Sequence, residues 1–274
     1  MRLEREQSVK EYLDIMDHRK TEQLIDTLDK VEQNRKECYI REFSIEHFHD
    51  SKVFETLIPK ICKIFREENE ELTGFENEEI LAEYQIYKTP GYVYMKGNVQ
   101  IYSAGKQAAD INAFPEGIAV AVGSEEDTPD ICPDQTIDKV FTIENLTSFY
   151  RFKQEHSLVI YLGGYHNHSR RNLLMQIYQK LPDAQYYHFG DLDAGGFYIL
   201  EHLKRKTGIP FQMFQMDIET LKKYEDYAKP LTENDKKRLM QLEKMELPDE
   251  ERKLITYMLQ KGIKLEQECI SESQ

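Results

Sequence analysis

Residues 186–203 read YYHFGDLDAGGFYILEHL, and this stretch decides how the second half of the chain is expected to fold. An aromatic run leads into Asp191 and Asp193, which are followed by two glycines and a stretch with helical spacing. The pattern indicates a buried strand that passes directly into a helix. The two aspartates therefore stand at the end of a strand, where they either cap the turn or hold a metal ion.

The same alternation of strand and helix repeats on both sides of this stretch. Four short apolar runs are expected to be strands, namely KVFTIEN (139–145), LVIYLGG (158–164), YYHFGD (186–191) and PFQMFQM (210–216). The first three are each followed by a helical stretch, at 146–155, 169–181 and 196–207. Strands that alternate with helices predict an α/β fold with a parallel sheet and flanking helices. The tail from residue 221 is expected to be helical, with a cap at Thr232.

The first half of the chain has a different pattern. Residues 1–40 are expected to form a helical arm, with an apolar stripe at Leu24, Leu28 and Val31. Residues 41–135 predict a small winged-helix-like α+β module, with a helix capped by Asp50 or Ser51, a second helix at NEEILAEYQI, and a hairpin in GYVYMKGNVQIYS (91–103). The polar loop SEEDTPDICPDQT (124–136) marks a boundary, after which residues 136–274 form the α/β domain with C-terminal helices.

Composition excludes several classes of protein. The chain has 274 residues, of which 40% are hydrophobic, and its four cysteines are scattered without a CxxC pair, so neither a zinc site nor a disulfide framework is expected. It has no apolar run that could span a bilayer and no signal-peptide core, which predicts a cytoplasmic protein. The net charge of −14 counts against a general polyanion-binding surface, although a local basic strip can coexist with acidic faces.

Three carboxylates are expected at one edge of the sheet. Glu144 ends the first predicted strand, and Asp191 and Asp193 end the third. Ligands of open parallel sheets bind outside the carboxyl ends of the strands, so the three side chains are expected in one crevice. They would repel each other unless a cation neutralised them, and Mg²⁺ prefers oxygen ligands. The set therefore suits metal-assisted chemistry on phosphoryl esters. The alternative is that Asp193 caps the helix while Asp191 is solvated.

Basic residues follow the second predicted strand, in GGYHNHSRRNLL. Arg170 and Arg171, near a helix N-terminus, are candidates for phosphate contact, and the alternative is that they are surface charges at a helix start. His166 and His168 are weaker candidates, as metal ligands or as a proton shuttle, and His168 joins the two arginines as a candidate phosphate contact.

Two of these stretches, FTIENLTSF (141–149) and HFGDLDAGGFYIL (188–200), resemble a Toprim domain, the metal-binding fold shared by topoisomerases, primases and some nucleases. The chain is more similar still to the JetD family, the Toprim-containing subunit of the Wadjet anti-plasmid system, whose Toprim domain is related to type IIB topoisomerase A subunits. HFHDSKVFETL (47–57) and KLEQECI (264–270) also carry this resemblance. The four stretches occur in family order and extend over roughly residues 43 to 270.

The resemblance implies a metal-dependent endonuclease subunit that hydrolyses phosphodiester bonds of closed-circular double-stranded DNA with Mg²⁺ or Mn²⁺. It implies a homodimer and a partner ATPase of the condensin-like, structural-maintenance-of-chromosomes type. Carried over by residue, Glu144 is the Toprim glutamate and Asp191 and Asp193 are the metal-binding pair. Glu266 and Glu268 in LEQE are further metal candidates, and the alternative is that they are the polar end of a C-terminal helix.

Two departures from the family pattern keep other functions open. Many Toprim domains carry a third aspartate two residues after the pair, where this chain has Gly195, and the part before the DSK stretch is shorter than in related chains. A non-catalytic DNA-sensing or assembly subunit with a vestigial metal site is therefore the alternative. A phosphatase of the haloacid-dehalogenase kind is a third reading, but there the DxD pair follows the first strand. Asp217 is expected to cap a helix.

Overall fold

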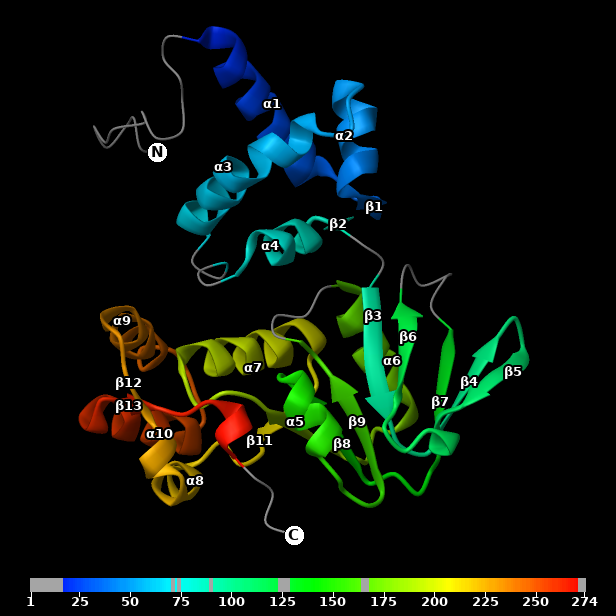
Figure 1. The fold of residues 1–274 in the computed structure, drawn as a ribbon, viewed down its shortest axis with the longest axis vertical. Coiled ribbons are helices and arrows are strands. Elements are labelled where there is room, and N and C mark those ends of the chain that lie inside the picture. Colours follow the sequence, from blue (N-terminus) through cyan, green and yellow to red (C-terminus); the bar gives the residue numbers. More distant parts are fainter. Residues whose placement is uncertain are drawn as a thin grey trace. The chain divides into compact units, whose positions relative to one another are not determined.

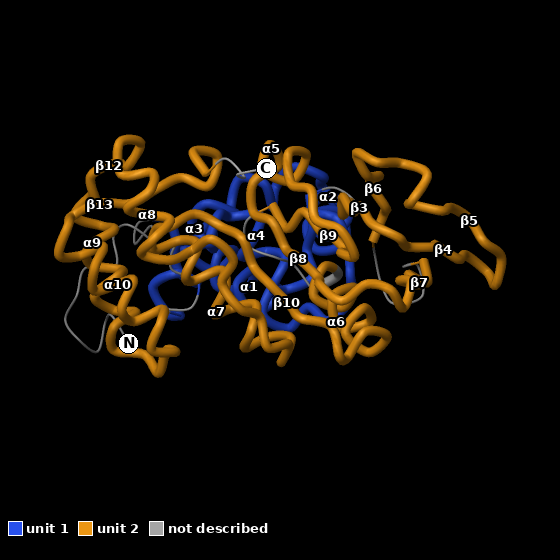
Figure 2. Tube along the Cα trace, turned by 90° about the horizontal axis from the view of Figure 1, so that it is seen from below, with its two compact units in different colours: residues 1–90 blue, residues 91–274 orange. Residues whose placement is uncertain are grey.

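The chain divides at Pro90 and Gly91 into two units, residues 1–90 and 91–274 (Figure 2). The structure is a computed structural model that describes residues 17–69, 72, 75–88, 91–122, 129–163 and 168–270, without the side chains of residues 91, 168 and 169. Of the helical arm expected over residues 1–40, residues 1–16 lie outside the described residues.

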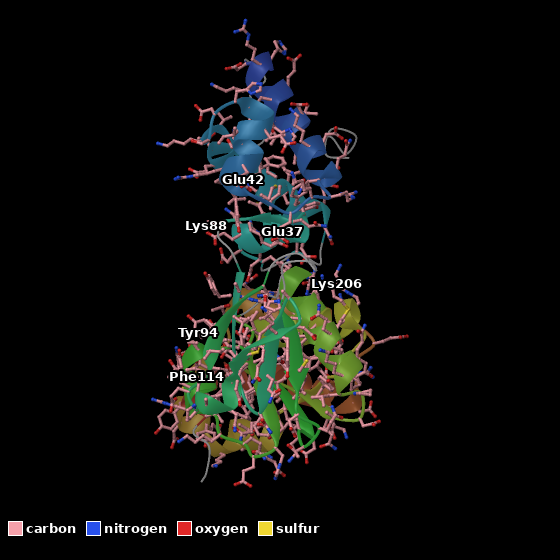
Figure 3. All side chains as sticks on the ribbon, turned by 90° about the vertical axis from the view of Figure 1, so that its right-hand side faces the viewer. Glu37, Glu42, Lys88, Tyr94, Phe114 and Lys206 are labelled. Atoms are coloured by element: carbon pink, nitrogen blue, oxygen red, sulfur yellow. The ribbon has the colours of Figure 1, made fainter. Side chains whose placement is uncertain are left out.

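The first unit is mainly helical. Its elements are α1 (His18–Gln33), β1 (Cys38–Tyr39), α2 (Ile40–Phe48), α3 (Val53–Glu68), α4 (Asn77–Glu83) and β2 (Ile86–Tyr87), and β1 pairs in parallel with β2. Leu24 and Val31 of α1 are buried, as the apolar stripe predicts. The backbone N–H of Tyr39 donates to Glu42 Oε2 at 2.8 Å, so that Glu42, labelled in Figure 3, closes the first turn of α2.

The start of α3 differs from the sequence prediction. The residue before the helix is Lys52, whose side chain makes no capping hydrogen bond, so neither Asp50 nor Ser51 is the N-cap itself. Asp50 Oδ1 accepts the N–H of Lys52 at 2.7 Å and so caps only the turn that leads into α3. It does not reach the N–H of Phe54 in the first turn of the helix. Instead, the hydroxyl of Ser44 accepts the N–H of Phe54 at 3.0 Å. Ser44 is buried in α2, and its oxygen satisfies a backbone donor of the following helix.

The second unit contains the sheet. Its strands are β3 (Gly91–Lys96), β4 (Val99–Ser103), β5 (Lys106–Asp110), β6 (Ile118–Val122), β7 (Asp130–Pro133), β8 (Lys139–Ile143), β9 (Ser157–Tyr161), β10 (Gln185–Phe189), β11 (Gln212–Met213), β12 (Lys229–Pro230) and β13 (Ile263–Lys264). Its helices are α5 (Leu146–Arg151), α6 (His168–Lys180), α7 (Ala194–Thr207), α8 (Ile218–Lys223), α9 (Glu233–Leu242) and α10 (Asp249–Lys261).

Six strands form one mostly parallel sheet, in the order β11-β10-β8-β9-β3-β6 (Figure 1). The four strands expected from the sequence, β8 to β11, run parallel to one another, and β3 and β6 add an antiparallel edge next to β9. Nearly every residue of β8 and β9 is buried, which is typical of parallel strands with both faces covered. The expected α/β fold with flanking helices is confirmed.

Helices cover both faces of this sheet. Successive side chains of a strand point to opposite faces, and Tyr186 and Tyr187 of β10 illustrate this. The Tyr186 ring lies 5.2 Å from that of Tyr178 in α6, whereas Tyr187 stacks on Phe141 of β8 at 5.2 Å. Phe152, directly after α5, packs on the Phe141 side at 4.7 Å. The sheet is therefore enclosed by α6 on one face and by the α5 region on the other.

The hairpin expected over residues 91–103 is wrong. Strand β3 pairs with β6 and β9, whereas β4 pairs with β5 and β7 in a separate three-stranded sheet. The turn at Gly97 has φ +136°, and a Cβ there would lie 2.5 Å from the carbonyl oxygen of Ser157. The turn is thus packed against the start of β9, and the two strands diverge into different sheets.

This pairing also moves the domain boundary. The sequence placed it at residues 135/136, but the compact units divide at residues 90/91. The reason is that β3 and β6, expected in the winged-helix-like module, hydrogen-bond into the same sheet as β8, β9 and β10.

Candidate active site

Glu144 and Asp191 lie side by side because the strands that precede them are neighbours. Strands β8 and β10 are parallel, with Ile143 opposite Phe189. The backbone N–H of Glu144 donates to the carbonyl oxygen of Phe189 at 3.0 Å, and the N–H of Asp191 donates to Glu144 Oε2 at 3.4 Å. The sequence-based prediction that both residues stand at the carboxyl edge of one sheet agrees with this arrangement.

Gly190 provides the space for the Glu144 carboxylate. A Cβ at this position would lie 2.5 Å from Glu144 Oε2 and 2.9 Å from Nε2 of His188, a fully buried residue. Both distances are far below a normal contact, so the Glu144 carboxylate occupies the space that a Cβ of residue 190 would need. Any larger residue would displace it.

The Asp191 carboxylate lies in a partly buried, acidic environment. Its Oδ1 accepts the backbone N–H of Gln267 at 2.7 Å. Burial is the main cause that raises the pKa of Asp191 to about 6; the Gln267 N–H acts in the opposite direction, and the charges of Asp193, Glu268 and Glu266 raise it further. A carboxyl group with such a pKa is typical of functional sites, although structural networks also produce it.

Asp193 is the N-cap of α7. Its Oδ1 accepts the N–H of Gly196 at 2.9 Å, so the capping alternative considered for this residue is confirmed. A role in metal binding stays a prediction for Asp193. Gly196 is needed for a different reason: a Cβ there would lie 2.2 Å from the backbone oxygen of Asp191. The first turn of α7 therefore packs directly on the Asp191 backbone.

Glu266 and Glu268 reach the same edge from the end of the described chain. They are not the end of a helix, because α10 ends at Lys261 and the residues that follow form β13 and the short 3₁₀ turn Gln267–Cys269. Glu268 Oε1 accepts from Asn145 Nδ2 at 2.5 Å, and Glu266 forms an ion pair with Lys229. Of the two, Glu268 is thus tied directly to the residue after Glu144.

Gln267 is a site residue that the sequence analysis missed. It is fully buried, and its hydrogen bonds reach Asn145, Phe189 and Asp191. The LEQE stretch drew attention to its two glutamates, and the only sequence signal for Gln267 was its place between them.

The two arginine candidates are partly or fully buried, and their role as phosphate contacts stays a prediction. Arg170 Nη1 donates to the carbonyl oxygen of Leu162 at 2.7 Å, and its side chain is partly buried. Arg171 is only 7% exposed. Its charge is one of the causes that lower the pKa of His202 to about 3, after burial, so it lies toward α7 and away from solvent. His166 and the side chain of His168 lie outside the described residues.

The carboxylates fit Mg²⁺ or Mn²⁺ by the chemistry of their donors. Both ions prefer oxygen ligands, and Glu144, Asp191 and Glu268 supply them within one acidic cluster. Among the described residues, however, no group of three or more His, Cys, Asp or Glu side chains is arranged to surround an ion. Metal binding at this edge stays a prediction.

A separate pocket, with a volume of about 830 Å³, lies at the other end of the strands. It is lined by residues that precede β8 and β9, such as Thr136 and His156, and by Phe114, labelled in Figure 3. The pocket does not include the carboxylates.

Within the described ranges, no helix is long and apolar enough to cross a membrane.

Comparison with known proteins gives two matches. A curated Wadjet protein JetD from Bacillus cereus (strain Q1) is 29% identical over 255 residues, an alignment that covers 91% of this chain and 61% of that protein. The family model described as Wadjet protein JetD, C-terminal, matches residues 127–274, which is more than half of the chain and includes Glu144, Asp191, Asp193, Glu266 and Glu268. The chain therefore belongs to the family of the C-terminal region of the Wadjet protein JetD.

Proposed function

We propose that this chain is a metal-dependent endonuclease subunit of the Wadjet anti-plasmid system, and that it hydrolyses phosphodiester bonds of closed-circular plasmid DNA through a Toprim-type site. The observation that carries the proposal is the placement of Glu144 and Asp191, side by side at the carboxyl ends of adjacent parallel strands. Membership of the JetD family supports the role in the Wadjet system.

In this proposal Glu144, Asp191 and Asp193 hold Mg²⁺ or Mn²⁺, with Glu268 and Glu266 as further ligands. The ion, when bound, supplies the activation of an attacking water and the stabilisation of charge on the phosphate. The chain's own groups orient the donors: Gly190 leaves room for the Glu144 carboxylate, and the Gln267 N–H holds one oxygen of Asp191. Arg170, at the start of α6, would contact a DNA phosphate.

The partners follow from the same proposal. The substrate is double-stranded plasmid DNA, the second protein is a condensin-like ATPase of the structural-maintenance-of-chromosomes type, the subunit is a homodimer, and its action takes place in the cytoplasm. The chain spans about 61% of the length of its Bacillus cereus relative, so contacts that depend on the rest of that protein are part of the proposal. A net charge of −14 suits delivery of DNA by a motor partner better than capture from solution.

The test is cleavage of supercoiled plasmid in Mg²⁺ or Mn²⁺, with and without the ATPase partner. Glu144→Gln and Asp191→Asn are each expected to lower the cleavage rate by about 100-fold or more, because each removes a charged oxygen donor. Asp217→Asn is the matched control, since Asp217 also follows a strand of the sheet but caps α8 through the Thr220 N–H. Carboxylate variants that cleave at the wild-type rate would make the proposal wrong.

A second function is favoured by one observation. The described residues contain no group of three acidic or histidine side chains arranged around an ion, as expected for a DNA-sensing or assembly subunit whose metal site is vestigial. Titration calorimetry separates the two functions. Binding of Mn²⁺ that is lost in Asp191→Asn supports the nuclease, whereas a wild-type chain that binds neither Mg²⁺ nor Mn²⁺ supports the sensor.

A further inference from the structure

The side chain of Gln267 joins the two strand ends that carry Glu144 and Asp191. Its Oε1 accepts the backbone N–H of Asn145 at 2.8 Å, and its Nε2 donates to the carbonyl oxygen of Phe189 at 3.0 Å. Asn145 follows Glu144 directly after β8, and Phe189 is the last residue of β10. One amide group therefore binds both strands at their carboxyl ends.

Gln267 also contacts Asp191 through its backbone. Its N–H donates to Asp191 Oδ1 at 2.7 Å, so the position of the side-chain amide and the position of this donor depend on each other. The amide is fully buried, where a polar group left without partners would be costly, and the two neighbouring backbone groups satisfy its donor and its acceptor. Neither an ionised glutamate, which only accepts hydrogen bonds, nor a methionine could make both bonds.

The segment around Gln267 is held to the sheet at further points. The backbones of Leu192 and Leu265 exchange two hydrogen bonds, of 2.9 and 3.1 Å. The amide of Asn145 donates to Glu268 Oε1, while its Oδ1 accepts the N–H groups of Thr147 and Ser148 and so caps α5. Figure 1 shows this C-terminal segment, in red, beside α5.

We infer that Gln267 is a positioning residue for the carboxylate cluster. Its amide fixes the Glu144–Asn145 turn relative to Asp191. Because Glu268 is the next residue, the same contact brings the Glu268 side chain beside Asn145 and Asp191. The inference rests on the proposed metal site for its functional meaning. Its geometric part, that one buried amide sets the relation of the two strand ends, does not depend on metal.

The experiment uses Gln267→Met, which keeps the volume of the side chain and removes both of its hydrogen bonds. Leu181→Ala is the control, because Leu181 is a buried residue of the same unit near the start of β10, at the opposite end of the sheet. Two quantities are measured on the full chain: Mn²⁺ affinity by titration calorimetry, and amide hydrogen exchange of residues 141–147 and 188–194. Thermal melting of both variants checks that they lose comparable stability.

In Gln267→Met we expect Mn²⁺ affinity to fall by about tenfold or more, as for other residues that orient metal ligands, and the Asn145 amide to exchange faster. Leu181→Ala is expected to change neither. Gln267→Glu retains an acceptor, so it should protect the Asn145 amide; at a pH where the introduced carboxyl is ionised it should still weaken Mn²⁺ binding, because the donor to Phe189 is then lost.

Two results would overturn the inference. One is an unchanged exchange rate at Asn145 in Gln267→Met, which would mean that the amide does not hold the strand ends. The other is a loss of Mn²⁺ affinity no greater than in Leu181→Ala, which would leave Gln267 a merely structural residue. If the wild-type chain binds no Mn²⁺, the proposed function fails, and the exchange data alone decide whether Gln267 positions the strands.

Discussion

Replacing Asp191 by asparagine is expected to stabilise the metal-free protein at neutral pH. Burial, with added repulsion from Asp193, Glu268 and Glu266, raises the pKa of this carboxyl from 3.8 to about 6. A shift of about two units corresponds to about 3 kcal/mol of differential free energy between the two protonation states. The folded-state pKa is the higher one, so the protonated carboxyl contributes to the free energy of unfolding of the wild type. This contribution is fully present below about pH 4 and is lost as the pH rises through 6.

Asparagine cannot ionise, but its side-chain oxygen can still accept the Gln267 N–H. The free energy of unfolding of Asp191→Asn should therefore exceed that of the wild type by up to about 3 kcal/mol at pH 8 and should approach it near pH 4. Urea denaturation followed by circular dichroism, in EDTA and from pH 4 to 8, measures both limits. Asp217→Asn, at an exposed cap, should differ little from the wild type throughout.

The reasoning would be refuted if Asp191→Asn were no more stable than the wild type at pH 8. It would equally be refuted if a stability gain persisted unchanged at pH 4, because the cause would then not be the ionised carboxylate. A stability gain of Asp191→Asn that is confined to high pH would show that the ionised Asp191 destabilises the fold, as residues of functional sites often do.

Two further pairs of substitutions test the backbone contact beside Asp191 and a buried ion pair between α7 and α10. Gly196→Ala should lower the free energy of unfolding by about 2 kcal/mol, because its Cβ would lie 2.2 Å from the Asp191 backbone oxygen. Gly195→Ala should change the free energy of unfolding by less than about 1 kcal/mol. Equal melting temperatures of the two variants would contradict this prediction. Lys204→Met should lower the free energy of unfolding by about 3 kcal/mol at pH 8, because it leaves the Glu251 carboxylate without its cation. Glu251 is 3% exposed, and burial raises its pKa to about 7. In urea denaturation, the Lys204→Met, Glu251→Leu double variant should recover most of that loss.

The parts of the fold that the sequence predicted correctly depend on local patterns. The end of β10, the start of α7 and the caps at Asp193 and Asp217 each follow from a few adjacent residues. The capping box of Thr232 at the start of α9 belongs to the same group. The meeting of Glu144 and Asp191 needed one more assumption, that β8 and β10 lie side by side, and the rule for parallel sheets supplied it.

The hairpin failed because strand pairing is not local. The turn at Lys96-Gly97-Asn98 has the composition of a hairpin turn, and both flanking segments are strands. Which partner a strand takes depends on the distant strands that compete for its edges. Here β9 and β6 take the edges of β3, and nothing within residues 91–103 indicates this.

Gln267 could not be predicted for a related reason. Its partners lie 76 to 122 residues earlier in the chain, and glutamine is most often an exposed residue. Only the folded structure shows that this one is buried between two strand ends. The burial of Arg171 could not be predicted either. The sequence places α6 correctly, but it does not indicate which side of this helix faces inward.

The long sequence separation of the Gln267 contacts has a consequence for biosynthesis. Strands β8 to β10 and their helices can pair as soon as they leave the ribosome, because their contacts span short stretches of chain. The segment that holds Asp191 and Asn145 emerges some 75 residues after Asp191 itself. During translation, the acidic cluster is therefore assembled only after residue 270 has been released from the exit tunnel, and a nascent chain exposes its carboxylates without their final arrangement.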